Sequence, residues 1–219
     1  MGSLRLYDYE ASANCYKVRL LLAQLGMAYE RVPIDIFDGQ TLTDEYARIN
    51  PARSTPVLDV DGAYLPESGA ILAYLAEGTP FLPGDRLDRA HVLRWLIFEQ
   101  TDVMSTIGGL RFRLLTGRWT SEDEQARLRR DAALAALSLM DRHLTQHDFV
   151  VGEHYSIADI AVYGYTHVAA EAGLDLGSFP AVETWLERVA SQPGHVNDLE
   201  PYPPNARPGA GRPIYGASA

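Results

Sequence analysis

The sequence has little cysteine, a single lysine and no long apolar run. Its one cysteine, Cys15, excludes an intrachain disulfide framework and a zinc site built from cysteines, and it fits a reducing compartment. No stretch approaches the roughly 18 apolar residues of a membrane-spanning helix. The first six residues also lack the apolar core of a signal peptide. We therefore expect a cytoplasmic protein without a membrane anchor.

Positive charge is also scarce. The 219 residues carry 19 basic and 29 acidic side chains, a formal net charge of −10 at pH 7. A chain this acidic repels phosphate groups, so we expect neither nucleic acid nor an anionic membrane as a partner. The composition is 47% hydrophobic and 22% charged, which is typical of a folded globular chain and excludes a disordered one.

The first 79 residues alternate between strand and helix patterns. Apolar residues recur at helical spacing within 17–26, and Asp61-Gly62 between two apolar runs is typical of a two-residue hairpin turn. Pro33 places its strand at a sheet edge or a strand end. The expected elements are, in order, strand 4–9, helix 17–26, strand 29–36, helix 43–49, strands 57–60 and 63–65, and a helix from residue 68.

The second half shows only helical periodicity. We expect helices at 86–117, 121–147, 156–172 and 179–191. The first is either one long helix or a broken pair, with Gly108-Gly109 as the candidate bend. The predicted fold is therefore an α/β domain followed by an all-α domain. The predicted boundaries are 1–79 for the first domain, 80–85 for a linker, 86–199 for the helical domain and 200–219 for a tail.

The tail from residue 200 to 219 contains five prolines and three glycines, so we expect irregular backbone. Two interpretations remain open. The tail is either a frayed end or an arm that folds back over a site, with Tyr202 and Tyr215 as its contact residues.

Three loops carry candidate chemistry. Residues 10–17 lead from a strand into a helix, whose N-terminus offers unpaired N–H groups and partial positive charge to an anion, although Ser12 or Asn14 can equally be a simple helix cap. Pro56 begins a strand after a loop and is a candidate cis proline that leaves the Val57 backbone free for an extended ligand. At the next strand-to-helix junction, Glu67 can hold an ammonium group and Ser68 can cap the helix.

At these three loops the sequence resembles the cytosolic glutathione transferases. The turn Ser12-Ala13-Asn14-Cys15-Tyr16-Lys17 resembles the active-site turn of the serine-type members, and Pro56-Val57 resembles their cis-proline loop. The segment 66–71 resembles the part that binds the γ-glutamyl end of glutathione, and 155–161 resembles a capping segment of the helical domain. The resemblance covers residues 4 to about 195 and implies a thioredoxin-like first domain with a helical second domain.

The resemblance also implies roles. Ser12 would donate its hydroxyl to the glutathione sulfur, and Asn14 resembles the asparagine of the bacterial Nu class, which favours disulfide reduction. Glutathione would be the co-substrate, with no metal required, and the second substrate would be an apolar electrophile or a disulfide. The assembly would be a homodimer, and its role would be detoxification. The remaining implied contacts with glutathione are Gln40, Arg53, Pro56, Val57, Glu67, Ser68 and Arg111, and Met104, Ile107 and Leu110 are candidates for the electrophile pocket.

Several alternatives stay open. Tyr7 or Tyr9 can replace Ser12 as the thiolate donor, and Cys15 is either a redox nucleophile at a helix N-terminus or a packed, inert thiol. His143 and His147 have a spacing that zinc can use, but we expect a solvated helix face. The chain is either a transferase, a glutathione-dependent disulfide or peroxide reductase, or a transferase-like binding protein without turnover. A different small thiol can also be the natural ligand.

Overall fold

The computed structural model describes residues 3–212, and the chain divides into two compact units. The first unit contains the residues up to Leu75 and also the segment from Asn197 onward, and the second runs from Ala76 to Val196. The first unit is thus discontinuous in sequence. Tyr215, one of the two predicted tail contacts, lies outside the described residues.

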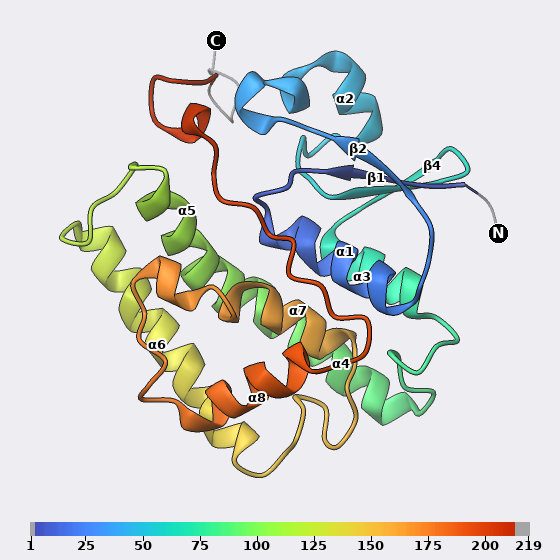
Figure 1. Ribbon diagram of the computed structural model, residues 1–219, viewed down its shortest axis with the longest axis vertical. Helices are drawn as coiled ribbons and strands as arrows, with labels where there is room; N and C mark the ends of the chain where they lie inside the picture. The colour runs from blue at the N-terminus through green and yellow to red at the C-terminus, as the bar shows by residue number, and fades with distance from the viewer. Residues whose placement is uncertain (1–2, 213–219) are drawn as a thin grey trace. The chain divides into compact units, whose positions relative to one another are not determined.

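A mixed four-stranded sheet forms the centre of the first unit (Figure 1). The strand order is β2-β1-β3-β4, with β1 and β2 parallel and the other neighbours antiparallel. Pro33 ends the edge strand β2, as predicted, so its missing N–H costs no ladder hydrogen bond. The strands are β1 Leu4–Asp8, β2 Glu30–Pro33, β3 Val57–Val60 and β4 Ala63–Pro66.

Helices cover both faces of this sheet, α1 and α3 on one face and α2 on the other (Figure 1). α1 begins four residues earlier than predicted, because the Ser12 side chain caps it by accepting a hydrogen bond from Cys15 N. β2 is shorter than predicted, because the Asp35 carboxylate accepts from Phe37 N and Asp38 N and starts a 3₁₀ turn. The bounds are α1 Ala13–Gln24, η1 Ile36–Asp38, η2 Gln40–Leu42, α2 Asp44–Ile49 and α3 Ser68–Ala76.

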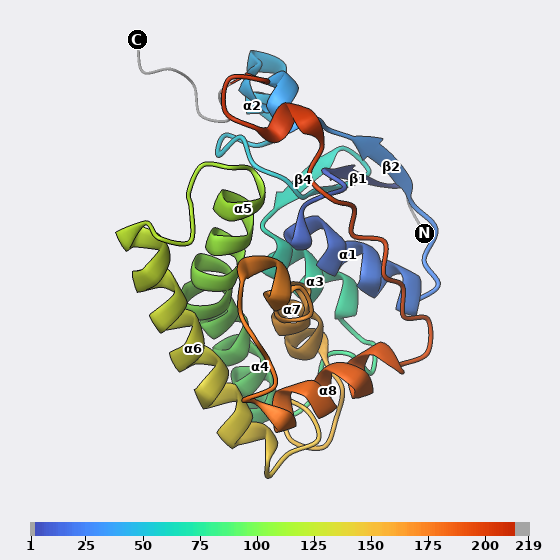
Figure 2. The same cartoon turned by 60° about the vertical axis from the view of Figure 1, so that its left-hand side comes forward.

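The second unit is entirely helical within the described residues (Figure 2). Every residue of α7 is buried, and α7 packs against η3, α4 and α8. No helix within residues 3–212 is long and apolar enough to span a bilayer. The elements are α4 Arg86–Phe98, the π-helical η3 Glu99–Gly108, α5 Gly109–Leu115, α6 Glu124–Leu144, α7 Ile157–Thr166, η4 Ala169–Ala172 and α8 Pro180–Ala190; η5 Pro204–Ala206 belongs to the first unit.

Of the two alternatives for residues 86–117, the structure has one continuous helix and not a pair broken at Gly108-Gly109. Both glycines have helical dihedral angles, and the backbone stays helical from Arg86 to Leu115. The glycines serve close packing instead. A Cβ at position 108 would lie 2.6 Å from the ring of Tyr165, and one at 109 would lie 2.9 Å from Arg129 Nη1. Because residues 108 and 109 have no side chains, α7 and α6 can approach this helix closely.

A buried carboxylate organises the start of α7. Asp159 forms the predicted capping box with Ser156, accepting from Ser156 N at 3.0 Å while Ser156 Oγ accepts from Ala158 N. Asp159 Oδ1 also accepts from Val150 N at 2.9 Å and from Trp185 Nε1 at 3.0 Å. One side chain therefore joins the α6–α7 loop, α7 and α8.

We predict that Asp159→Ala lowers the free energy of unfolding by about 3 kcal/mol or more, because it leaves three buried N–H groups without an acceptor. Burial raises the pKa of Asp159 to about 6. The folded state therefore holds this proton more tightly than the unfolded state, and the wild type gains stability over the variant as pH falls from about 6 to about 4. Urea unfolding at pH 4.5 and 7 measures both effects. Asp131→Ala, which removes an exposed acid of α6, is the control; equal losses in the two variants would contradict the prediction.

Candidate functional site

The turn between β1 and α1 presents Ser12 at a helix N-terminus. Ser12 has extended backbone, and its Oγ accepts a hydrogen bond from Cys15 N at 3.4 Å. A hydroxyl that accepts one hydrogen bond still carries a hydrogen to donate. Ser12 is only partly buried, so this hydroxyl lies where a ligand can reach it beside the partial positive charge of α1.

Asn14 connects this turn to the start of α3. Its Oδ1 accepts from Lys17 Nζ at 2.8 Å and from Ser68 Oγ at 3.5 Å. With the oxygen turned toward these donors, the amide NH2 faces the other way, where it can donate to an anion. Lys17 is a residue that our sequence interpretation missed. It is fully buried and places a positive charge behind Asn14, and its being the only lysine beside eighteen arginines was the available signal.

The junction of β4 and α3 has an unusual backbone. Glu67 has φ of 73° without being glycine, a left-handed conformation of the kind that costs about 1–3 kcal/mol and clusters at functional sites. Ser68 is the first residue of α3, so Glu67, and not Ser68, occupies the cap position. The Ser68 hydroxyl bonds to Asn14, and the exposed Glu67 carboxylate remains available to a ligand.

The loop before β3 contains the cis peptide bond Thr55–Pro56, as predicted. Val57 follows directly and lies opposite Tyr7 of β1 and Pro66 of β4. Pro66 has no N–H, so it cannot donate to the Val57 carbonyl. The Thr55 side chain contacts the thiol of Cys15, which brings this loop to the β1–α1 turn.

Gln40 begins η2, and the Arg53 side chain reaches the other end of η2 from the loop after α2. Arg53 donates to Leu42 O and pairs with Asp44 at 3.6 Å, while Gln40 Oε1 accepts from Asp35 N at 2.9 Å. Both side chains are tied to the loop 35–44, so their polar ends hold that loop in shape.

The remaining predicted residues belong to the helical unit. Arg111 is buried and forms an ion pair with Glu171 at 2.6 Å. Ile107 and Leu110 are fully buried, whereas Met104 is partly exposed. Met104 is thus the most accessible of the three electrophile-pocket candidates.

Cys15 is a packed thiol. Its side chain is fully buried and its Sγ accepts from Tyr9 N at 3.4 Å. Burial, together with the nearby Asp8 carboxylate, raises the pKa of Cys15 to about 12. Since the thiolate is the reactive form, this geometry agrees with the inert interpretation and contradicts a redox nucleophile.

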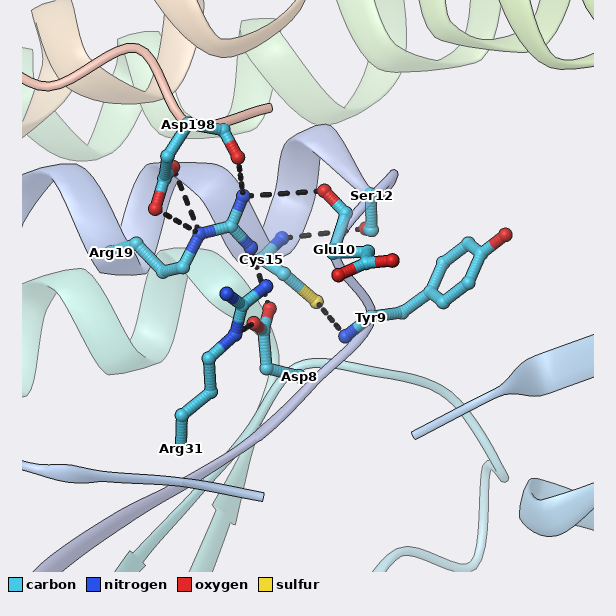
Figure 3. Close-up of polar contacts among 8 residues, drawn as sticks. All are labelled: Asp8, Tyr9, Glu10, Ser12, Cys15, Arg19, Arg31 and Asp198. Carbon is cyan, nitrogen blue, oxygen red and sulfur yellow. Dashed lines mark hydrogen bonds and ion pairs between the residues drawn. The ribbon is translucent and has the colours of Figure 1, made fainter. Parts of the chain in front are cut away.

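A buried charge network anchors the turn (Figure 3). Arg19 of α1 donates to Asp8 Oδ1 at 2.6 Å and to Glu10 O at 3.3 Å, and its Nε pairs with Asp198 Oδ2 at 2.9 Å. Arg31 of β2 pairs with the other oxygen of Asp8. The network thereby joins β1, α1, β2 and the C-terminal segment around the residues that precede Ser12.

The segment 197–212 continues along the first unit, so for these residues the interpretation as a frayed end is wrong. Glu200 N donates to Glu10 O at 3.2 Å, and the Tyr202 ring lies 6.5 Å from that of Tyr9. The segment is then fixed to the loop after β2 by Asn205 Nδ2 to Asp35 Oδ2 at 2.8 Å and by Arg212 N to Phe37 O at 2.7 Å. We call residues 197–212 the strap.

We predict that Asp198→Ala loosens the strap, because Arg19 Nε loses both oxygens of its carboxylate partner at the point where the strap begins. Hydrogen exchange at the amides of Glu200 and Arg212 should accelerate about tenfold or more, while exchange in α6 stays unchanged. Glu200→Ala is the matched control, since it removes a nearby exposed acid that makes no side-chain bond in the described part of the chain. Unchanged exchange in Asp198→Ala would show that the strap is held elsewhere.

His143 and His147 do not form a solvated face as expected. Both are partly buried, with ring centroids 4.4 Å apart, and His143 Nε2 contacts Val150 O at 3.0 Å. They line a cavity within the helical unit.

Comparison with known proteins agrees with this architecture. Residues 6–81 match the glutathione S-transferase N-terminal domain, and residues 103–193 match the C-terminal domain of the same family. A glutathione S-transferase from Pseudomonas fluorescens superposes with a TM-score of 0.87 and 41% identity, over 90% of this chain and 99% of that one.

Two further relatives bear on the chemistry. The disulfide-bond oxidoreductase YfcG of Escherichia coli is 30% identical, over 84% of this chain and 89% of that protein. A glutathione transferase family member of Pseudomonas fluorescens, solved with two glutathione molecules bound, has a TM-score of 0.80 and 25% identity over 92% of this chain and 94% of that one. The domain matches, the two-unit fold and these relatives together establish that this chain belongs to the glutathione S-transferase family.

Proposed function

We propose that the chain is a glutathione transferase of the serine type, which holds the thiolate of glutathione at the N-terminus of α1 for attack on an electrophilic small molecule. The observation that supports this proposal most directly is that three separate loops meet at the N-terminus of α1. Ser68 bonds to Asn14, Thr55 beside cis-Pro56 contacts Cys15, and Ser12 caps the helix that carries both.

The lowering of the thiol pKa that this proposal requires is modest. A free thiol has a pKa of about 8.5, and each unit of depression needs about 1.4 kcal/mol of preference for the thiolate. A hydrogen bond from the Ser12 hydroxyl and the partial positive charge of α1 together supply roughly one to two units. The Lys17 ammonium behind Asn14 favours the anion further.

The rest of glutathione extends over the neighbouring loops. In this proposal the Val57 backbone pairs with the cysteinyl part, and Glu67 with Ser68 holds the γ-glutamyl end. Gln40 and Arg53 reach the peptide carboxylates by releasing their present contacts with the loop 35–44. Arg111 contributes from the helical unit, and Met104 and Ile107 belong to the electrophile pocket.

Asn14 favours a second candidate function, the glutathione-dependent reduction of disulfides. Its amide donates to a sulfur held by Ser12, and a relative covering most of this chain is a disulfide-bond oxidoreductase. In such a reaction the bound thiolate attacks one sulfur of the disulfide, forms a mixed disulfide with it and releases the other sulfur as a thiolate. A second glutathione thiolate then attacks the glutathione sulfur of the mixed disulfide, which releases the remaining substrate sulfur as a thiolate and forms glutathione disulfide. We propose a homodimer in the cytoplasm as the working form.

Calorimetric titration of the protein with reduced glutathione at pH 7 tests the proposal. Dissociation constants from micromolar to low millimolar, weakened by Glu67→Gln, support it. A folded protein that does not bind glutathione contradicts it and directs the search to another small thiol. Steady-state rates with an aryl halide and with a small disulfide then distinguish conjugation from reduction.

We predict that Ser12→Ala raises the thiol pKa of bound glutathione by about one unit and lowers the rate constant for conjugation about tenfold at pH 7, because the sulfur loses a hydrogen bond that favours its anion. The ultraviolet absorbance of the thiolate, followed against pH, measures the pKa. Ser12→Thr keeps a hydroxyl and should keep most of the activity. If Ser12→Ala leaves both quantities unchanged while Tyr7→Phe alters them, Tyr7 is the thiolate donor.

We predict that Cys15→Ala retains glutathione-dependent turnover within about threefold for both an electrophile and a disulfide, because a thiol with a pKa of about 12 is protonated at neutral pH. Parallel rate measurements on the wild type and the variant check this, with urea unfolding as a control for stability. If the Cys15→Ala variant loses disulfide reduction but keeps conjugation, Cys15 takes part in the reduction.

A further inference from the structure

A cavity of about 440 Å³ lies within the helical unit. Its walls come from the connection before α4, from α4, from the end of α6 and from the loop before α7. None of the residues assigned to glutathione or the electrophile lines it. The volume is within the range of small-molecule sites in proteins.

The lining of the cavity has a buried part and an exposed, charged part. Val150 and Ser156 of the lining are buried, whereas His91, Arg94 and Glu153 are exposed, and we take the exposed residues as the rim. Pro80, Pro83, Val151 and the ring of Tyr155 contribute further apolar surface to the walls. An apolar body inside, with a polar group directed at the rim, therefore fits the lining.

Imidazole groups dominate the polar part of the lining. Four of the chain's six histidines line the cavity, namely His91, His143, His147 and His154. The His143 ring lies 4.4 Å from that of His147 and 5.0 Å from that of Trp95, and its Nε2 faces Val150 O. Within residues 3–212, no three potential metal ligands are placed to share an ion, so we treat these imidazoles as hydrogen-bond donors and proton acceptors.

The charge of the lining depends on these histidines. Asp88 of α4 and Glu153 of the loop before α7 are its carboxylates, and Arg94 of α4 is its guanidinium. With neutral imidazoles, the two carboxylates outweigh the one cation, whereas protonation of two or more histidines makes the lining positive. The Arg94 guanidinium stacks over the Trp95 ring at 4.8 Å and makes no ion pair with any residue in 3–212.

The groups around His143 disfavour its protonated form. Burial lowers the pKa of His143, and so do the neighbouring His147, Arg94 and His91. The other charged groups near this end of the helices already have partners: Asp159 of α7 accepts from Val150 N, and Arg188 of α8 pairs with Asp148 at 3.2 Å. A negative charge placed beside His143 therefore offsets the repulsion that disfavours its protonated form.

We propose that this cavity is a second ligand site, which binds a small aromatic carboxylate and takes up protons as it does so. The aromatic ring lies against the proline, valine and tyrosine walls, and the carboxylate lies against Arg94 and His147. Because the bound anion favours imidazolium, the affinity rises as pH falls from 8 to 6. The proposal is independent of the thiol site, since every lining residue belongs to the helical unit.

Titration calorimetry with naphthalene-1-carboxylate as the probe tests the site in the full chain. The dissociation constant should fall about fivefold or more between pH 8 and pH 6. At pH 7, titrations in two buffers of different ionisation enthalpy should reveal net proton uptake. Saturating reduced glutathione should leave the dissociation constant unchanged.

Matched variants locate the probe. Arg94→Gln and His147→Gln should each weaken binding about tenfold, because each removes a hydrogen-bond partner of the carboxylate, and His143→Gln should reduce the proton uptake. Arg142→Gln, which removes an exposed arginine of α6 outside the lining, should bind like the wild type. Circular dichroism confirms that each variant is folded.

Three results would overturn the proposal. The first is no binding at pH 6. The second is binding that glutathione abolishes and that Arg94→Gln leaves intact, which would place the probe elsewhere. The third is binding without proton uptake, which would remove the histidines from the site.

Discussion

The candidate thiol site depends on the buried guanidinium of Arg19. Arginine keeps its charge in any protein environment, so a fully buried Arg19 requires partners, and the chain supplies the Asp8 and Asp198 carboxylates with the Glu10 carbonyl. These partners lie on β1, on the strap and in the turn that leads to Ser12. Removing any one of them leaves a buried charge incompletely paired, which costs more than the pair itself contributes. The shape of the turn follows from this requirement.

Two serine residues cap helices in this chain, and the two caps have different roles. Ser156 begins α7 within a reciprocal capping box, and Asp159 satisfies the remaining donors around it, so nothing there is left for a ligand. Ser12 begins α1 with one long hydrogen bond of 3.4 Å, and α1 has no acidic residue in its first turn. The N-terminus of α7 has its donors satisfied within the chain, whereas the N-terminus of α1 offers its donors and its partial positive charge to an anion.

Much of the architecture could be predicted from the sequence, because local patterns determine it. Apolar periodicity identified the helices, Asp61-Gly62 identified the hairpin between β3 and β4, and a proline at the start of a strand identified the cis peptide bond at Pro56. The family motifs likewise indicated the three loops that meet at α1. The positions of Arg53, Gln40 and Arg111 in ligand binding stay predictions.

The errors arose where long-range contacts override local pattern. Gly108-Gly109 reads locally as a helix breaker, but the glycines make room for Tyr165 and Arg129, which lie far away in sequence. The role of Arg19 depends on Asp198, 179 residues further along the chain, and no periodicity of α1 reveals that pairing. The proline-rich composition of the strap predicted irregular backbone correctly, but its attachment to Glu10, Asp35 and Phe37 is a tertiary property.

The discontinuity of the first unit has a consequence for the order of folding during synthesis. Domains generally fold as the ribosome releases them, N-terminal part first. Here the sheet and its helices emerge by residue 75, yet the carboxylate that completes the shell around Arg19 is residue 198, after the whole helical unit. The nascent first unit must therefore wait, with a charged side chain incompletely paired in its interior, until residue 198 has left the exit tunnel. Completion of the thiol site is in this way tied to synthesis of the whole helical unit.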